Sequence, residues 1–181
     1  MRFDLIIKSI KLYTVRKIII IRGNSGCGKT TVSQLLQKQL GREILLIPQD
    51  VARHDMLHVK DVPGNLSIKF MKYLVDFGFQ NCEYTILERI LYADYYQDLF
   101  QHIINLYADQ VYAYYFTAPF DVTYLRQKNR PTCNKFGVKE MREIWRDNDY
   151  LPNIKETTID TLNMSAEKIV AKILADINFK Q

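Results

Sequence analysis

The chain has 181 residues, of which 48% are apolar and 25% are Lys, Arg, Asp or Glu, values typical of one soluble globular domain with a substantial core. Its longest apolar runs are too short to span a bilayer, and its charged first residues do not fit a signal peptide, so we expect a cytoplasmic protein with no membrane partner. The net charge of +5 comes without a run of five basic residues, so nucleic acid is not expected as a partner, and no pattern indicates the oligomeric state.

The apolar pattern predicts strands that alternate with helices along the chain. Residues 1–16 form an N-terminal extension, which could be an edge strand or a short amphipathic helix. The strands are expected at Lys17–Arg22, Ile44–Ile47, Tyr84–Glu88, Val111–Phe116 and Thr157–Leu162. The helices are expected from Lys29 to about Gln39, within a mixed stretch at 51–64, and at Leu66–Phe79, Asp94–Tyr107, Phe120–Asn129, Val138–Asp147 and Ala166–Ile177. This alternation implies parallel strands joined by right-handed crossovers, in a single domain spanning residues 1–181.

A glycine-rich loop joins the first strand to the first helix. Four consecutive isoleucines, at 18–21, run into GNSGCGKT and then into a helical pattern, which is the spacing and context of a P-loop. The amides of such a loop cradle phosphate oxygens at the positive end of a helix. Lys29 is expected to reach the β- and γ-phosphates, and the Thr30 hydroxyl to ligate the Mg²⁺ that bridges them. The residues expected to hold the nucleotide are Gly23, Asn24, Ser25, Gly26, Cys27, Gly28, Lys29, Thr30 and Thr31, of which Thr31 most resembles an ordinary first-turn residue.

Two carboxylates follow buried strands. Asp50 comes just after the second strand and Glu88 ends the third, at the edge where open α/β sheets bind their ligands. If those strands neighbour the first, one carboxylate could accept a proton from an attacking hydroxyl, and the other could hold Mg²⁺ through water or orient the substrate. Either could instead cap the following helix, and Arg89 could pair with Glu88 outside the site. Arg53, one turn after Asp50, is a candidate for holding an acceptor or its negative group.

Arginines flank a polar loop in the last third of the chain. Arg126 and Arg130 are four residues apart on one predicted helix, and Arg142 and Arg146 repeat that spacing beyond the loop. A lid over about residues 126–146, with arginines that face one another, would stabilise the transferring charge and exclude water. The alternative is a solvated helix face whose arginines pair with acidic residues. Arg126 and Arg130 are the stronger catalytic candidates, because they lie nearer the ligand-side end of the fourth strand.

These motifs together resemble a known family. RGNSGCGKTT, LLIPQD, ILER and RQKNRP look like the small P-loop kinases related to zeta toxin and chloramphenicol phosphotransferase, in the nucleoside and nucleotide kinase group. The resemblance covers about residues 17–177. It implies a three-layer α/β P-loop NTPase fold with a five-stranded parallel sheet, ATP and Mg²⁺ as cofactors, a catalytic base at Asp50 and ATP-binding lid arginines at Arg126 and Arg130. The family commonly ends its third strand with Glu-Gly, whereas this chain has Glu88-Arg89.

The expected function is transfer of the γ-phosphoryl group of Mg-ATP to a hydroxyl of a small molecule. Lys29, Thr30 and the loop amides would hold Mg-ATP, and Asp50 would activate the hydroxyl. One alternative is a nucleoside monophosphate kinase, in which Arg53 and the lid arginines would bind an acceptor phosphate. Another is a nucleotide-dependent binding module or switch with slow ATP hydrolysis. The acceptor pocket is expected within residues 51–80 and about 89–97, where spacing names no acceptor.

Overall fold

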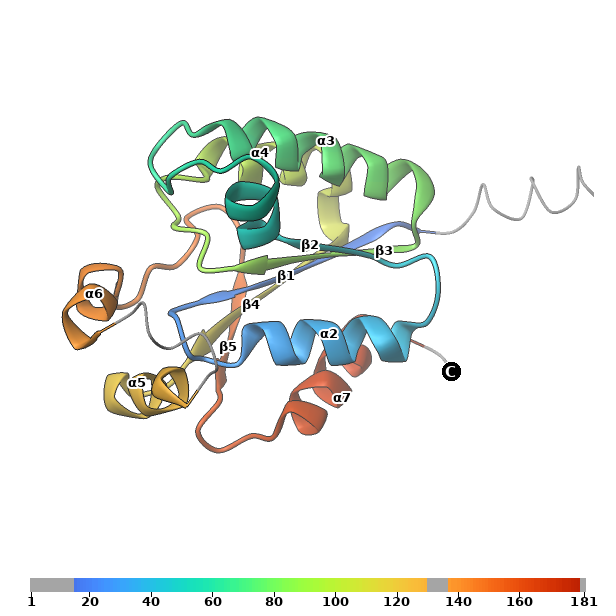
Figure 1. Cartoon of the computed structure of the whole chain (residues 1–181). Coiled ribbons are helices and arrows are strands. Elements are labelled where there is room, and N and C mark those ends of the chain that lie inside the picture. Colours follow the sequence, from blue (N-terminus) through green and yellow to red (C-terminus); the bar gives the residue numbers. More distant parts are fainter. Residues whose placement is uncertain (1–14, 130–136, 180–181) are drawn as a thin grey trace, which may run out of the picture.

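A five-stranded parallel sheet forms the centre of the molecule, in a computed structural model that describes residues 15–129 and 137–179 (Figure 1). The order across the sheet is β2-β3-β1-β4-β5, and every neighbouring pair runs parallel. The expected α/β fold class is therefore confirmed. The strands are β1 (Lys17–Gly23), β2 (Leu45–Pro48), β3 (Tyr84–Arg89), β4 (Val111–Thr117) and β5 (Glu156–Asp160).

Helices cover both faces of this sheet. In Figure 1, α3 and α4 lie on one face and α2 and α7 on the other, while α5 and α6 lie beyond the carboxyl ends of the strands. Within residues 15–129 and 137–179, no helix has the length and apolar character needed to cross a membrane. The helices are α2 (Lys29–Leu40), the π-helix η1 (Val51–Met56), α3 (Leu66–Asn81), α4 (Gln97–Tyr107), the 3₁₀ turn η2 (Ala108–Gln110), α5 (Phe120–Lys128), α6 (Val138–Glu143) and α7 (Ala166–Asp176).

The four isoleucines of β1 are completely buried, because two of them pack beneath the helices on each face of the sheet. Ile18 and Ile20 belong to the core beneath α3 and α4, and Ile19 and Ile21 to the core beneath α2 and α7. Successive side chains of a strand point to opposite faces of a sheet, so a strand covered on both sides must be apolar at every position. Full burial of each isoleucine contributes roughly 1.5–3 kcal/mol to stability. This rigid central strand carries the loop that follows it.

Several elements end earlier or begin later than the apolar pattern predicts. β5 ends at Asp160 instead of Leu162, because the Asp160 carboxylate accepts the Leu162 N–H in a turn. α4 begins at Gln97 instead of Asp94, and the Asp94 side chain accepts the N–H of Tyr95. α6 ends at Glu143 instead of Asp147. Most of the predicted extension, residues 1–14, lies outside the described residues.

Candidate active site

The P-loop occupies the turn between β1 and α2. Gly26 and Gly28 have φ values of 82° and 84°, a left-handed conformation that favours glycine. A Cβ on Gly26 would lie 2.5 Å from the Thr123 carbonyl oxygen, and one on Gly23 would collide with the Phe116 carbonyl, so the loop fits tightly against β4 and α5. At Gly28, by contrast, an added Cβ would meet nothing within 4 Å. The loop therefore packs against β4 and α5 at Gly23 and Gly26, and it has open space at Gly28, where phosphate would lie.

Lys29 and Thr30 stand at the start of α2, where the helix presents its free amides. The Lys29 ammonium is buried in the loop and donates to the Asn24 carbonyl oxygen at 2.7 Å. The Thr30 hydroxyl lies 3.3 and 3.4 Å from the two carboxylate oxygens of Glu88. This contact arises because β3 pairs directly with β1, with Ile21 opposite Glu88. Lys29, Thr30 and Glu88 therefore converge on one point beside the phosphate cradle.

Glu88 is buried, with only 3% of the residue exposed. Burial raises the pKa of Glu88, although Lys29, Arg89 and the Thr30 hydroxyl act in the opposite direction. In the described part of the chain, no group of three or more His, Cys, Asp or Glu side chains could hold a metal ion. Mg²⁺ at a nucleotide needs only one or two protein oxygens, since phosphates and waters supply the rest. The Thr30 hydroxyl and the Glu88 carboxylate fit that requirement.

Asp50 lies farther from the P-loop than Glu88, because β2 is separated from β1 by β3. One Asp50 oxygen is 3.3 Å from an Arg53 nitrogen, and the other pairs with Arg89. Arg89 therefore pairs with Asp50, which follows the neighbouring strand β2, and Glu88 contacts Thr30. Arg53 also donates to the Val59 carbonyl at 2.9 Å. A carboxylate held between two guanidinium groups thus follows β2 at the carboxyl edge of the sheet.

Arg126 lies on the other side of the P-loop, on α5. Its guanidinium donates to the hydroxyl and carbonyl oxygens of Thr161 at 3.2 and 2.9 Å. Sequence reasoning missed Thr161, because the fifth strand was expected to continue to Leu162, whereas it ends at Asp160. The two residues border a cavity of about 310 Å³ against the loop, lined by Gly26, Cys27, Gly28, Thr31, Val32, Arg126, Thr161, Met164, Ala166 and Ile169. Burial raises the pKa of the Cys27 thiol there, despite the charges of Lys29 and Arg126.

The expected face-to-face arrangement of lid arginines is not found among the described residues. Arg142 packs over the Phe120 ring, with its guanidinium carbon 4.2 Å from the ring centroid. Arg146 lies beyond the end of α6, so Arg142 and Arg146 do not share a helical face. The Arg146 guanidinium pairs with Asp94 at 2.5 Å. The prediction of a shared face was wrong because α6 ends at Glu143. Arg130 lies outside the described residues.

A buried cation beneath the P-loop was also missed. Arg22, the residue before Gly23, has no exposed surface, and its guanidinium pairs with Asp149 at 2.6 Å and Glu156 at 3.0 Å. It also donates to the Leu91 carbonyl at 3.0 Å. Burial raises the pKa of Glu156, with Arg22 and the Leu151 amide acting in the opposite direction. This network joins the end of β1 to the segments that follow β3 and precede β5.

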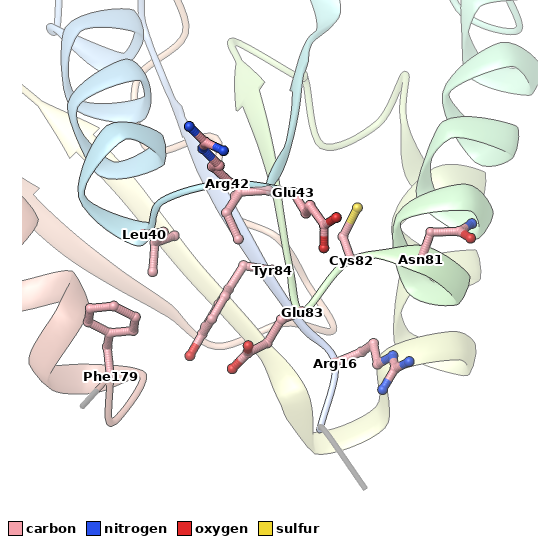
Figure 2. A pocket seen from close by; sticks show the side chains of 10 residues that line it. Arg16, Leu40, Arg42, Glu43, Asn81, Cys82, Glu83, Tyr84 and Phe179 are labelled. Carbon is pink, nitrogen blue, oxygen red and sulfur yellow. The ribbon is translucent and has the colours of Figure 1, made fainter. Parts of the chain in front are cut away.

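Another cavity, of about 270 Å³, lies at the amino ends of the strands, opposite the P-loop (Figure 2). The Tyr84 and Phe179 rings lie edge to face there, with centroids 6.1 Å apart and ring planes at 74°. None of the predicted site residues lines this cavity, whose walls are formed by Arg16, Leu40, Arg42, Glu43, Ile44, Asn81, Cys82, Glu83, Tyr84 and Phe179. The candidate active site is therefore the carboxyl edge alone.

Comparison with known proteins agrees with this geometry. A shikimate kinase from Bacillus licheniformis is 22% identical over 171 residues, covering 91% of this chain and 96% of that enzyme. A structure from Chloroflexus aurantiacus with a provisional kinase assignment has a TM-score of 0.70 at 20% identity, covering 92% of this chain and 98% of that one. A gluconokinase from Sinorhizobium meliloti has a TM-score of 0.64 at 14% identity, covering 91% and 93%.

These likenesses establish the P-loop kinase fold, and the recurrence of kinases supports the expectation of an ATP-dependent kinase. They do not establish a closer relation to zeta toxin or chloramphenicol phosphotransferase. A family model described as an AAA domain matches residues 19–146, which include the P-loop, Asp50, Glu88 and Arg126. Because this match covers well over half of the sequence, the chain belongs to the AAA domain family.

Proposed function

We propose that the protein is an ATP-dependent kinase that transfers the γ-phosphoryl group of Mg-ATP to a hydroxyl of a small molecule. The observation that carries the proposal is the row of groups along the carboxyl edge of the sheet. Lys29 lies in the P-loop, Glu88 contacts Thr30 one strand away, and Asp50 follows the next strand. A phosphate-binding group, a metal-binding pair and a carboxylate base in that order are what phosphoryl transfer to a hydroxyl requires.

On the donor side, the loop amides and Lys29 would hold the phosphates, and the Thr30 hydroxyl and Glu88 would hold Mg²⁺ directly or through water. When bound, Mg²⁺ would neutralise the charge that develops on the β- and γ-oxygens. The cavity of about 310 Å³ beside Gly26 and Arg126 has the size of a small-ligand pocket and adjoins the cradle, which suits the base and ribose of ATP. Arg126 would then border the nucleotide.

On the acceptor side, Asp50 would accept the proton of the attacking hydroxyl. Its two arginine partners, Arg53 and Arg89, come from η1 and β3 and fix the carboxylate from both sides. The same guanidinium groups favour a second candidate, a kinase whose acceptor carries a phosphate, because planar guanidinium groups bind phosphate well. Product analysis separates the two: a nucleoside diphosphate formed from AMP, UMP or CMP indicates the phosphate acceptor.

Phosphoryl transfer from γ-labelled ATP to a panel of sugars, nucleosides, hydroxy acids and nucleoside monophosphates tests the proposal. Asp50→Asn should lower transfer about 10²- to 10⁴-fold, the range of a lost general base, while ATP binding persists. Asp55→Asn is the matched control, since Asp55 lies nearby but its side chain is 64% exposed. Full transfer by Asp50→Asn would contradict the base assignment. ATP binding without transfer to any acceptor would instead favour a nucleotide-dependent switch.

We propose that residues 1–181 form one kinase domain that acts in the cytoplasm, and that Arg130 assists Arg126 at the phosphates. A relation to zeta toxin and chloramphenicol phosphotransferase belongs to the same proposal. The shared motif order supports it.

A further inference from the structure

Asn24, the first variable residue of the P-loop, is tied to a segment more than a hundred residues away. Its side-chain amide nitrogen donates to the Arg146 carbonyl oxygen at 2.7 Å, and its side-chain oxygen accepts the Arg146 N–H at 3.1 Å. The two bonds fix the amide orientation, because a flipped amide would set donor against donor and acceptor against acceptor. Asn24 is 7% exposed, so water does not easily replace these bonds.

The backbone of the same residue holds the main cation of the loop. The Asn24 carbonyl oxygen accepts the Lys29 ammonium at 2.7 Å in a buried contact. To reach the β- and γ-phosphates, this ammonium must leave that oxygen, or share its three protons between carbonyl and phosphate. The direction of the Asn24 carbonyl therefore determines the position of the Lys29 ammonium before the nucleotide binds. That direction depends on the peptide that the Asn24 side chain anchors.

Arg146, the residue to which the Asn24 side chain bonds, is itself held in place. The Arg146 guanidinium pairs with Asp94 at 2.5 Å and lies over the rings of Tyr92 and Tyr95, 4.1 and 4.8 Å from their centroids. It is also 3.7 Å from Asp149. These contacts fasten Arg146 to the segment after β3, on the proposed acceptor side. The Asn24 side chain thus connects the phosphate loop to a point set by the acceptor side of the molecule.

We propose that Asn24 is a positioning residue for phosphoryl transfer, which acts through Lys29 by keeping the loop peptide aligned with the segment around Arg146. The inference rests on the proposed kinase function and deepens it. Without the side chain, the peptide can rotate, and the ammonium no longer starts from one position. Such misplacement weakens stabilisation of the transition state more than binding of the ground state, because the loop amides and the Lys29 charge still attract the phosphates.

Steady-state turnover of Mg-ATP, by hydrolysis or by transfer, tests this role. Asn24→Ala should lower kcat about 10- to 100-fold and change the KM for ATP less than about threefold. Asn24→Asp keeps the shape and the acceptor but, when ionised, cannot donate to the Arg146 carbonyl, and it should lower kcat in the same direction. Asn81→Ala is the matched control: the Asn81 side-chain nitrogen also donates to a backbone carbonyl, that of Phe77 at 2.8 Å, but Asn81 lines the cavity at the amino ends of the strands, opposite the P-loop.

The outcomes separate this role from the function on which it rests. Unchanged kcat in both Asn24 variants, or an equal loss of kcat in Asn81→Ala at similar thermal stability, would overturn the positioning role and leave a structural one. A rise in KM alone would overturn it too, because that pattern indicates lost ground-state binding. A wild-type protein without any Mg-ATP turnover would contradict the proposed kinase function itself.

Discussion

Arg22→Met is expected to destabilise the protein strongly. The Arg22 guanidinium has no exposed surface, pairs with Asp149 and Glu156, and donates to the Leu91 carbonyl. It also lies 5.3 Å from the centroid of the Tyr115 ring. Methionine fills much of the same space but carries no charge, so the substitution leaves Glu156 and the Leu91 carbonyl without their cation, and Asp149 with Arg146 alone at 3.7 Å.

The expected cost follows from that burial. Removing one partner of a buried ion pair costs about 3–5 kcal/mol, because the remaining charge stays buried without compensation. A domain of this size is stable by roughly 5–15 kcal/mol, so the change consumes a large share of that stability. At about 2–4 °C per kcal/mol, the Tm should fall by roughly 6–20 °C.

The pH dependence of the loss identifies its cause. Burial already raises the pKa of Glu156, and Arg22 opposes that rise, so removing Arg22 raises this pKa further. A carboxyl group whose pKa is raised by folding binds its proton more tightly in the folded state, and stability therefore falls as pH rises through that range. The deficit of Arg22→Met should be smaller near pH 5 than near pH 8.

Urea unfolding followed by fluorescence, with wild type and variant at both pH values, measures the two free energies. Arg42→Met is the control, since Arg42 is exposed and surface substitutions usually change stability by less than about 0.5 kcal/mol. A second substitution, Glu156→Gln, added to Arg22→Met should restore part of the loss at the higher pH. A loss below about 1 kcal/mol, or a deficit that does not vary with pH, would refute the reasoning.

Three further predictions concern the loop and its neighbours. Gly26→Ala should abolish Mg-ATP binding in a fluorescence titration, because the added Cβ would lie 2.5 Å from the Thr123 carbonyl oxygen and the backbone there is left-handed. Retained affinity would show that the loop can move. Burial raises the pKa of Glu88, so wild-type turnover should decline on the acid side at a higher pH than an exposed glutamate would give. Glu88→Gln should lower kcat about 10²-fold and move that decline to lower pH, and a wild-type profile that stays flat on the acid side would contradict the assignment. Thr161→Val removes the hydroxyl 3.2 Å from Arg126 but keeps the carbonyl contact. The KM for ATP should rise about threefold to tenfold with little change in kcat. An unchanged KM would show that the Thr161–Arg126 contact does not contribute to nucleotide binding.

The sequence identifies the sheet well because its strands are buried on both faces. A run such as Ile18–Ile21 has no stable position except between two apolar layers, so the strand is evident without knowledge of its partners. The Ser165 cap of α7 is similarly local, since its side chain accepts the N–H of Lys168. Element ends are harder to predict, as Asp160 shows: a carboxylate that bonds the chain two residues later stops β5 early.

The candidate site shows the same contrast between local features, which can be predicted, and contacts between distant residues, which cannot. The P-loop is readable because all its groups come from one stretch of about eight residues. The pairing of Arg89 with Asp50, by contrast, depends on β2 lying beside β3, and the Thr30–Glu88 contact depends on β3 lying beside β1. Strand order is a property of the folded chain that residue spacing does not encode. For the same reason, the bonds between Asn24 and Arg146 could not be predicted from the sequence.

The central position of β1 has a consequence for how the protein acquires its fold. Ile18 pairs with Thr85 on one side and with Val111 on the other, so the first strand finds both neighbours only in the later part of the chain. Contacts between residues so distant along the chain slow folding, because a long loop must close before the contact forms. During synthesis the phosphate loop is made before the Phe116 carbonyl against which Gly23 packs. The loop can therefore take its final shape only after β4 has been made.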